Sequence, residues 1–169
     1  MSDSTRKSRQ QVVDSLHQVA AEMHNRMQRG DPPRMTLPVR SKSNISFDNR
    51  LGVFKYGKSK TVRDATKLGS ARQLLRTLHI TEFIEEMIDS GKSSTLREMY
   101  YISEGWGNGK FGSQNESNNL AEDLEIVTKC LREDFKLRPE EDGARIIGNI
   151  TVEERNRRGE WMTINCRDD

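Results

Sequence analysis

Apolar residues recur at helical spacing near the start of the chain. Between residues 9 and 28 they lie three or four positions apart, on one face of a helix: Val12, Leu16, Val19, Met23 and Met27. A glycine and two prolines at positions 30, 32 and 33 stop the pattern. We therefore predict an amphipathic helix whose apolar stripe either folds back on the rest of the chain or docks on a partner.

The next stretch alternates between apolar and polar residues, which is the pattern of half-buried strands. Met35, Leu37 and Val39 share one face, and shorter alternating pieces follow at 45–47 and 53–56. Turn-forming residues separate these pieces. The segment predicts two or three short strands.

Two longer helices are predicted farther along. The first covers about residues 70–90, with Ser70 and Gln73 as a capping box and Gly91 as its stop. The second covers about residues 119–135 and carries an apolar stripe at helical spacing. Both helices therefore have a side that can be buried.

A short helix between them begins at Thr95. Thr95 and Glu98 form a capping box, in which each side chain satisfies a free backbone N–H of the first turn. Arg97 and Tyr101 are four positions apart and therefore share a face. Tyr100 points about 100° away from Tyr101 and is the better candidate for core packing.

Residues 146–152 and 161–166 are predicted to be two strands joined by a turn. Helix, short helix, loop, helix and β-hairpin is the order of elements in a winged-helix domain. We expect an α+β fold, a CAP-like helix-turn-helix with a β-hairpin wing, preceded by a short β-segment and an N-terminal amphipathic helix. Residues 1–31 would form the tail and helix, a candidate partner-binding arm, and residues 32–169 the winged-helix domain.

Composition limits the size and location of this fold. Apolar residues make up 33% of the chain and charged residues 32%, so the core is small. The sequence has no apolar run near the roughly 20 residues that span a membrane and no signal-peptide core at its start. We expect a soluble, intracellular protein with no membrane contact, in which Cys130 and Cys166 are buried free thiols.

Charge is distributed unevenly. Residues 34–76 hold eleven lysines and arginines against two acids, a net +9, whereas the whole chain carries +2. This asymmetry favours a nucleic-acid surface, with Lys58 and Lys60 as candidate DNA contacts. Arg157 and Arg158, at the predicted hairpin tip, suit phosphate contacts. The alternatives are a solvated loop region and an ordinary hairpin turn.

Arg97 and Tyr101 are the best candidates for chemistry. A phenol is largely protonated at neutral pH and is a poor nucleophile unless a positive neighbour favours its ionised form. The three histidines are scattered, with no pair at a ligating spacing except a surface stripe in the first helix. The glycine-rich loop at 105–112 lacks the Lys-Ser/Thr ending of a phosphate-binding P-loop and has no strand before it. A tyrosine beside an arginine could attack a phosphate, although core packing is the commoner role of a tyrosine pair.

Four blocks of sequence occur in the order found in one family. They are Ser94-Thr95-Leu96-Arg97-Glu98-Met99-Tyr100-Tyr101, Phe111-Gly112-Ser113-Gln114-Asn115-Glu116-Ser117, Glu122-Asp123-Leu124-Glu125 and Gly148-Asn149-Ile150-Thr151. Together with residues 33–45, they resemble the A subunit of DNA topoisomerase VI, whose family includes the meiotic double-strand-break transesterases. The resemblance covers roughly residues 32–166.

The resemblance implies a catalytic role for the tyrosine helix. It implies that Tyr101 attacks a DNA phosphodiester and forms a 5′-phosphotyrosyl link, that Arg97 is the active-site arginine of the motif, and that residues 32–169 bind and cleave DNA. Two protomers would each cut one strand of double-stranded DNA, as a homodimer within a heterotetramer.

The resemblance also implies partners and cofactors. They are an ATP-hydrolysing B subunit, which would suit the N-terminal helix, and Mg²⁺ held by a Toprim domain. We expect the Toprim domain to be absent from this chain and supplied by a longer chain or in trans, which would leave the chain alone incomplete for catalysis. The expected location is the cytoplasm and nucleoid of a prokaryote, or the nucleus of a eukaryote. The alternative function is a non-catalytic winged-helix module for DNA binding or complex assembly.

Overall fold

The computed structural model describes residues 7–50, 52–138, 150–155 and 161–165. The helices are α1 (Arg9–Gln28), α2 (Leu68–Ser90), α3 (Leu96–Ile102) and α4 (Gln114–Thr128), with 3₁₀ turns η1 (Lys42–Asn44), η2 (Ser103–Gly105) and η3 (Gly107–Gly109). The strands are β1 (Arg34–Pro38), β2 (Ile45–Asp48), β3 (Val53–Tyr56), β4 (Lys60–Asp64), β5 (Ser94–Thr95), β6 (Leu137–Arg138), β7 (Thr151–Arg155) and β8 (Trp161–Asn165). This mixture of helices and small sheets confirms the predicted α+β class.

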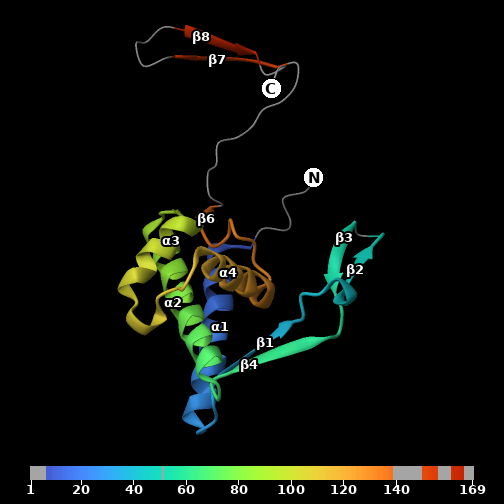
Figure 1. Cartoon of the computed structure of the whole chain (residues 1–169), viewed down its shortest axis with the longest axis vertical. Helices are drawn as coiled ribbons and strands as arrows, with labels where there is room; N and C mark the ends of the chain where they lie inside the picture. Colours follow the sequence, from blue (N-terminus) through green and yellow to red (C-terminus); the bar gives the residue numbers. More distant parts are fainter. Residues whose placement is uncertain (1–6, 51, 139–149, 156–160, 166–169) are drawn as a thin grey trace.

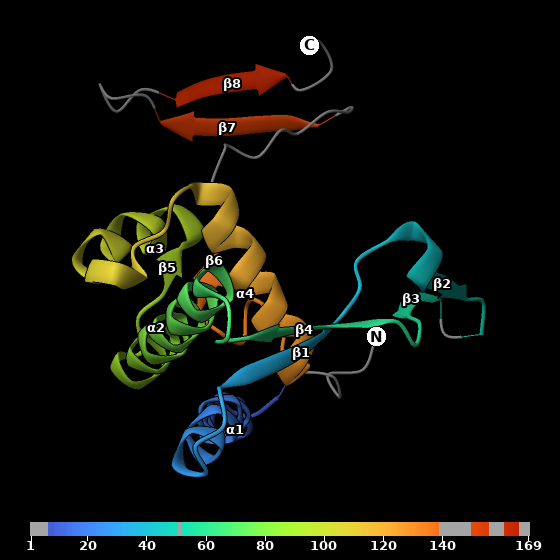
Figure 2. The same ribbon diagram turned by 60° about the horizontal axis from the view of Figure 1, so that its bottom comes forward.

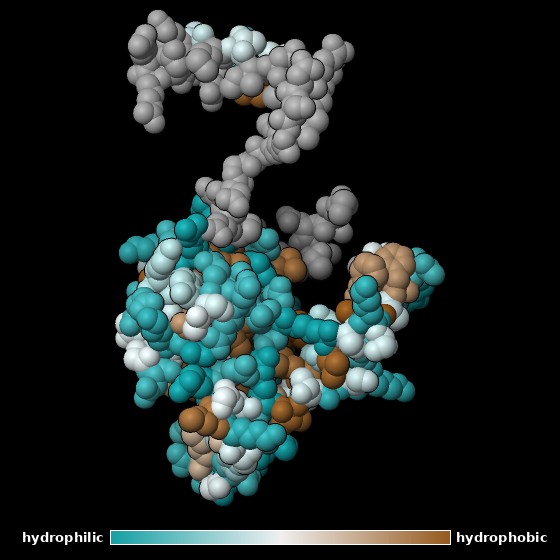
Figure 3. Space-filling view, viewed as in Figure 1, coloured by the Kyte–Doolittle hydropathy of each residue, from teal (hydrophilic) through white to brown (hydrophobic). Residues whose placement is uncertain are grey.

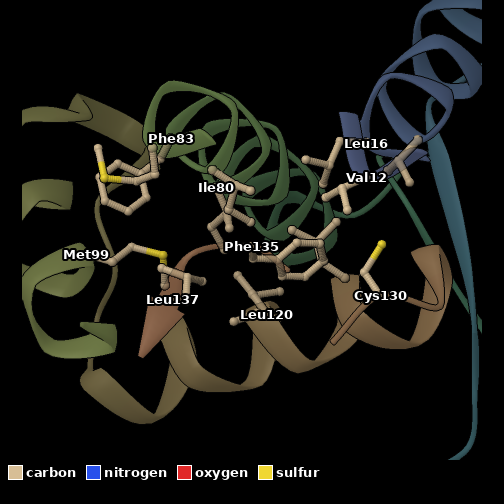
Figure 4. Packing of buried hydrophobic residues seen from close by; sticks show 14 of the residues in the cluster. Val12, Leu16, Ile80, Phe83, Met99, Leu120, Cys130, Phe135 and Leu137 are labelled. Carbon is tan, nitrogen blue, oxygen red and sulfur yellow. The ribbon is translucent and has the colours of Figure 1, made fainter. Parts of the chain in front are cut away.

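The helices gather into one body around a shared apolar core (Figure 1). The core takes Leu16 from α1, Ile80 from α2 and Leu120 from α4, and Phe135 closes it beside Cys130 (Figure 4). Cys130 is a buried free thiol, as predicted, whereas Cys166 lies outside the described residues. No helix in the described part of the chain is long and apolar enough to cross a membrane.

α1 folds back on the body. Val12, Leu16, Val19 and Met23 are buried against α2, α4 and the neighbouring β1, so the first of the two predicted alternatives is the observed one. The buried part of the stripe is therefore not available to a partner, and the role of residues 1–31 as a partner-binding arm stays a prediction. Of the stripe residues only Met27, at the last turn, is exposed.

Two predicted helix starts differ from the structure. α2 begins at Leu68 with Lys67 as its N-cap, so Ser70 lies inside the first turn and forms no capping box with Gln73. Gly91 ends α2 in the left-handed conformation, as predicted. α4 begins at Gln114, five residues before the predicted start, because the side chain of Ser113 caps it by accepting a hydrogen bond from the Glu116 N–H.

A two-part β-arm extends from the helical body (Figure 2). β1 pairs antiparallel with β4, a strand that the sequence did not predict, and β2 pairs antiparallel with β3 as a hairpin. Asn44 joins the two parts: its amide nitrogen donates to the Val39 and Ser59 carbonyls, both at 2.9 Å, and its amide oxygen accepts from the Ser59 N–H at 3.1 Å. The buried Asn44 therefore fixes the base of the β2–β3 hairpin.

Two further strand pairs complete the structure. β5 and β6 form a short parallel pair, with Ser94 opposite Leu137 and Thr95 opposite Arg138. β7 and β8 pair antiparallel, as predicted, but β7 runs to Arg155, three residues past the predicted end at 152, and residues 146–149 of the predicted strand lie outside the described residues. The main contacts of this hairpin are between its own two strands, so its assignment as a wing stays a prediction. Arg157 and Arg158 lie outside the described residues.

Candidate active site

The N-terminus of α3 is held by a complete capping box. The Glu98 N–H donates to Thr95 Oγ1 at 3.0 Å, and the Thr95 N–H donates to Glu98 Oε2 at 2.7 Å. The Ser94 hydroxyl donates a second bond to that carboxylate oxygen, at 3.1 Å. These bonds, that from the Thr95 backbone first, lower the pKa of Glu98 below its ordinary value. The predicted start of this helix is confirmed.

α3 presents one side to the core and the other to solvent. Leu96 and Met99 are buried, and α3 packs against α4. Arg97 and Tyr101 lie on the outer side, where Tyr101 is 55% exposed. Two buried anchors in seven residues fix how the helix is rotated and therefore which side chains face outward.

Arg97 and Tyr101 form a contact pair. Arg97 Nε donates to Tyr101 Oη over 3.5 Å, a long bond, and the guanidinium carbon lies 5.9 Å from the centre of the Tyr101 ring. Tyr100 instead packs against the core, with its ring centre 5.4 Å from that of Tyr101. The geometric part of the sequence interpretation, an exposed Arg97–Tyr101 pair with Tyr100 turned inward, is confirmed.

The glycine-rich loop after α3, residues 105–112, is a sealing loop: it packs against α2 and has a structural role. The buried Ser103 hydroxyl donates to the Tyr100 carbonyl at 2.6 Å and accepts from the Phe111 N–H at 3.3 Å. Trp106 stacks on His79 of α2, with ring centres 5.1 Å apart. A Cβ on Gly109 would lie 2.8 Å from His79 Nε2, so only glycine fits there without displacing that ring. The loop thus holds the C-terminus of α3 against α2.

Arg76 is a structural residue that the sequence did not single out. It is buried in α2, its Nε donates to the Lys110 carbonyl at 2.8 Å, and its guanidinium pairs with Glu116 of α4. Glu116 Oε2 also accepts from the Gly112 N–H at 2.8 Å. One arginine therefore ties α2, the sealing loop and the start of α4. Glu116 belongs to the second of the four sequence blocks, and its place there is the one sequence feature that pointed to this link.

The predicted basic surface of residues 34–76 separates into arginines that are paired with acids and lysines that are exposed. Arg40 and Arg63 both pair with Asp123, whose side chain is 3% exposed, and Arg40 also contacts Glu122 at 2.6 Å. These two arginines attach the β-arm to α4 and do not form a free basic patch. Lys58, between β3 and β4, and Lys60, the first residue of β4, are exposed. The β2–β3 hairpin that precedes them lies on the side of the helical body away from α3 (Figures 1 and 2). The structure does not bring the two lysines near Tyr101, and their contact with DNA stays a prediction.

The described residues do not fit a metal centre. Among them, no three histidine, cysteine or acidic side chains lie together in a group that could hold an ion. The carboxylates of Asp123 and Glu116 are instead paired with arginines, and that of Glu104 is paired with Lys110.

The fold and the exposed Arg97–Tyr101 pair define the class as a winged-helix-like α+β domain with a capped tyrosine helix. Residues 72–137, from early α2 to β6, match the family model of type IIB DNA topoisomerases. Residues 140–168 match a second model, the all-beta domain in the DNA topoisomerase VI alpha subunit. The β7–β8 hairpin thus falls in a segment with a family match of its own.

Curated relatives agree with both matches. The A subunit of type 2 DNA topoisomerase 6 from Halobacterium salinarum is 42% identical over 171 residues, which cover 100% of this chain and 46% of the relative. The A subunits of the same enzyme from Archaeoglobus fulgidus and Methanosarcina barkeri are 44% and 41% identical, over 89% and 98% of this chain and 42% and 46% of their own length. The chain belongs to the family of type IIB DNA topoisomerase A subunits. It spans about half the length of the curated relatives it matches.

Proposed function

We propose that this chain carries the DNA-cleaving tyrosine of a type IIB topoisomerase and that Tyr101 is the nucleophile. The observation that carries the proposal is the exposed Tyr101–Arg97 pair on a capped, anchored helix, in a chain of this family. An exposed phenol on a rigid element can reach a phosphate of a docked duplex, whereas Tyr100 packs against the core.

In the proposed reaction, Tyr101 Oη attacks the phosphorus of a DNA phosphodiester. A bond forms between Oη and phosphorus, and the bond from phosphorus to the 3′ oxygen breaks. The phenol proton leaves to solvent, and the departing 3′ oxygen takes up a proton. The product is a 5′-phosphotyrosyl link and a free 3′ hydroxyl, and the reverse reaction reseals the strand because the covalent link conserves the phosphodiester energy.

Arg97 lies beside the attacking oxygen in this proposal, because its Nε is 3.5 Å from Tyr101 Oη. Its N–H groups would stabilise negative charge on the attacked phosphate. The contact at 3.5 Å is long in the absence of DNA, as is common for catalytic groups before substrate binds.

The remaining parts of the activity are expected from outside the described residues. We propose that Mg²⁺ is held by a Toprim domain, that an ATP-hydrolysing B subunit drives the cycle, and that two protomers each cut one strand of double-stranded DNA.

The test uses a duplex whose scissile phosphate carries sulfur in place of the bridging 3′ oxygen. A 3′ thiolate leaves readily and attacks phosphotyrosine poorly, so the covalent product accumulates. The chain is mixed with this duplex, the B subunit, a polypeptide carrying the Toprim domain, Mg²⁺ and ATP, and then quenched with detergent. We expect protein-linked 5′ ends with the wild-type chain and with Tyr100→Phe, and none with Tyr101→Phe.

Arg97→Ala should lower the rate of linkage by roughly 10²–10³-fold, the usual effect of removing one charge-stabilising donor. If protein-linked 5′ ends still form with Tyr101→Phe, Tyr101 is not the nucleophile. Binding of the duplex without any linkage in the complete mixture would favour the non-catalytic module instead.

A further inference from the structure

Three cations from two separate stretches of the chain meet beside the start of the tyrosine helix. Lys92 lies just before β5, whereas Lys136 and Arg138 lie at β6, much farther along the sequence. The parallel pairing of β5 with β6 brings them together, and the Ser94 N–H donates to the Lys136 carbonyl at 3.0 Å. All three side chains are exposed, and they line one hollow of ≈ 310 Å³.

These cations are available to an anion from outside the chain. None of the three forms an ion pair with a carboxylate of the described residues, whereas Arg40 and Arg63 of the β-arm are both paired with Asp123. Glu133 is the acid among the described lining residues, so the cations outnumber it. The surface of the helical body around α3 is mostly hydrophilic (Figure 3), which suits a phosphate backbone better than an apolar partner.

The backbone at Lys136 is in a conformation that disfavours a lysine. Its φ is 58°, in the left-handed region that glycine adopts freely and that a residue with a side chain adopts at a cost. Lys129 has the same conformation, with φ 55°, but as the C-cap of α4 its charge interacts favourably with the end of that helix. Lys136 follows a turn instead. Local folding therefore does not explain the lysine, which indicates a role for its side chain outside the fold.

The hollow is close enough to Tyr101 to contact the same DNA strand. Thr95, the N-cap of α3, is in register with Arg138. After the Thr95 and Ser94 hydrogen bonds, the charge of Arg138 also lowers the pKa of Glu98 in the first turn. Tyr101 follows Thr95 by six residues, which is about 9 Å along the helix. Phosphates of one strand recur about every 3.4 Å along the duplex axis, so this length corresponds to about two or three phosphates.

We propose that Lys92, Lys136 and Arg138 bind adjacent backbone phosphates of double-stranded DNA, about two or three positions from the phosphate that Tyr101 attacks. These contacts fix the register of the strand along α3, because lysine and arginine contacts to phosphates position a protein on DNA without reading its sequence. The three are positioning residues and touch no reacting atom. This placement rests on the proposed role of Tyr101, whereas phosphate binding by the three cations does not.

The first test measures the affinity of the full 169-residue chain for a duplex at several salt concentrations. Lys92→Gln combined with Lys136→Gly should weaken binding at least about tenfold and reduce the slope of log affinity against log salt by about 1 to 2. The denaturation midpoint should stay equal or rise, because glycine suits the left-handed conformation. Lys129→Gly is the matched control, an exposed lysine of the same conformation outside the hollow, and should change the affinity less than about twofold.

Glu133→Gln tests the sign of the effect. Removing the acid that lines the hollow should tighten DNA binding by about twofold, because it removes repulsion of the phosphates. A purely structural role of the three cations would leave the salt slope unchanged in every variant.

The second test locates the contact on the DNA. A neutral methylphosphonate replaces single phosphates, one at a time, on either side of the scissile phosphate that the covalent product identifies. With the wild-type chain, the affinity should fall most about two or three positions from that phosphate, on one side. With the Lys92→Gln, Lys136→Gly variant the same replacement should have no further effect, since both partners of the contact are already removed.

Three results would overturn the proposal. They are an unchanged salt slope in the double variant, weaker binding by Glu133→Gln, and a methylphosphonate effect that is the same in the double variant and the wild type. If the complete mixture yields no covalent product, the assignment of Tyr101 fails, and the salt slope alone decides whether the three cations bind phosphate.

Discussion

Replacing Thr95 with alanine tests how far the tyrosine helix depends on its cap. α3 has only seven residues, and helices of that length do not persist in water without support. The substitution removes the oxygen that accepts the Glu98 N–H at 3.0 Å. Losing an N-cap of this kind costs about 1 kcal/mol, or about a fivefold increase in the unfolded fraction.

Glu98→Gln tests the other half of the cap and adds a dependence on pH. The folded pKa of Glu98 lies below its ordinary value of 4.5 because of the Thr95 and Ser94 hydrogen bonds. The stabilisation is therefore fully present above the unfolded pKa and is lost as pH falls through the folded pKa. Because the carboxylate is exposed, we expect the difference between wild type and Glu98→Gln to be at most about 1 kcal/mol at neutral pH, and to vanish well below pH 4.5.

Guanidinium denaturation followed by circular dichroism measures both effects. Glu133→Gln, another exposed carboxylate, serves as the control for a general change of charge. A free energy of unfolding of Thr95→Ala within about 0.2 kcal/mol of the wild-type value would refute the predicted role of the cap. A Glu98→Gln difference that is the same in acid as at neutral pH would refute it as well.

Two further predictions concern the charged residues of the β-arm. Asp123→Ala leaves Arg40 and Arg63 facing each other without their shared carboxylate and should destabilise the fold by about 3 kcal/mol in denaturation, with Glu133→Ala as the neutral comparison. Lys58→Glu with Lys60→Glu should weaken DNA binding and reduce the slope of log affinity against log salt by about 2, if both lysines contact phosphates; an unchanged slope would show that they do not.

The features that sequence alone predicted correctly depend on neighbouring residues. The cap of α3 was readable because Thr95 and Glu98 are three positions apart and interact only with their own turn. The stripe of α1 was readable because each apolar residue recurs within one helical turn. In both cases local spacing determines the structure, and the pairing of Arg97 with Tyr101 followed from the same spacing.

The sequence-based predictions failed where contacts between residues far apart in the chain determine the structure. α4 begins inside the polar run after Ser113, where no apolar repeat marks a helix, and Arg76 of α2 holds that start through Glu116. β4 has no buried apolar residue and exists because it pairs with β1. Nothing in the sequence near Asp123 marks it as a buried carboxylate, because the two arginines that pair with it come from the distant β-arm.

The parallel pairing of β5 with β6 has a mechanical consequence. Thr95, the cap of the tyrosine helix, is in register with Arg138, the last described residue before the segment that matches the all-beta domain, and the charge of Arg138 contributes to the lowered pKa of Glu98. A pull on the chain at Arg138 acts on this two-residue ladder, which is joined directly to the first turn of α3. The position of the chain that leaves the helical body is thus mechanically coupled to the helix that carries Tyr101.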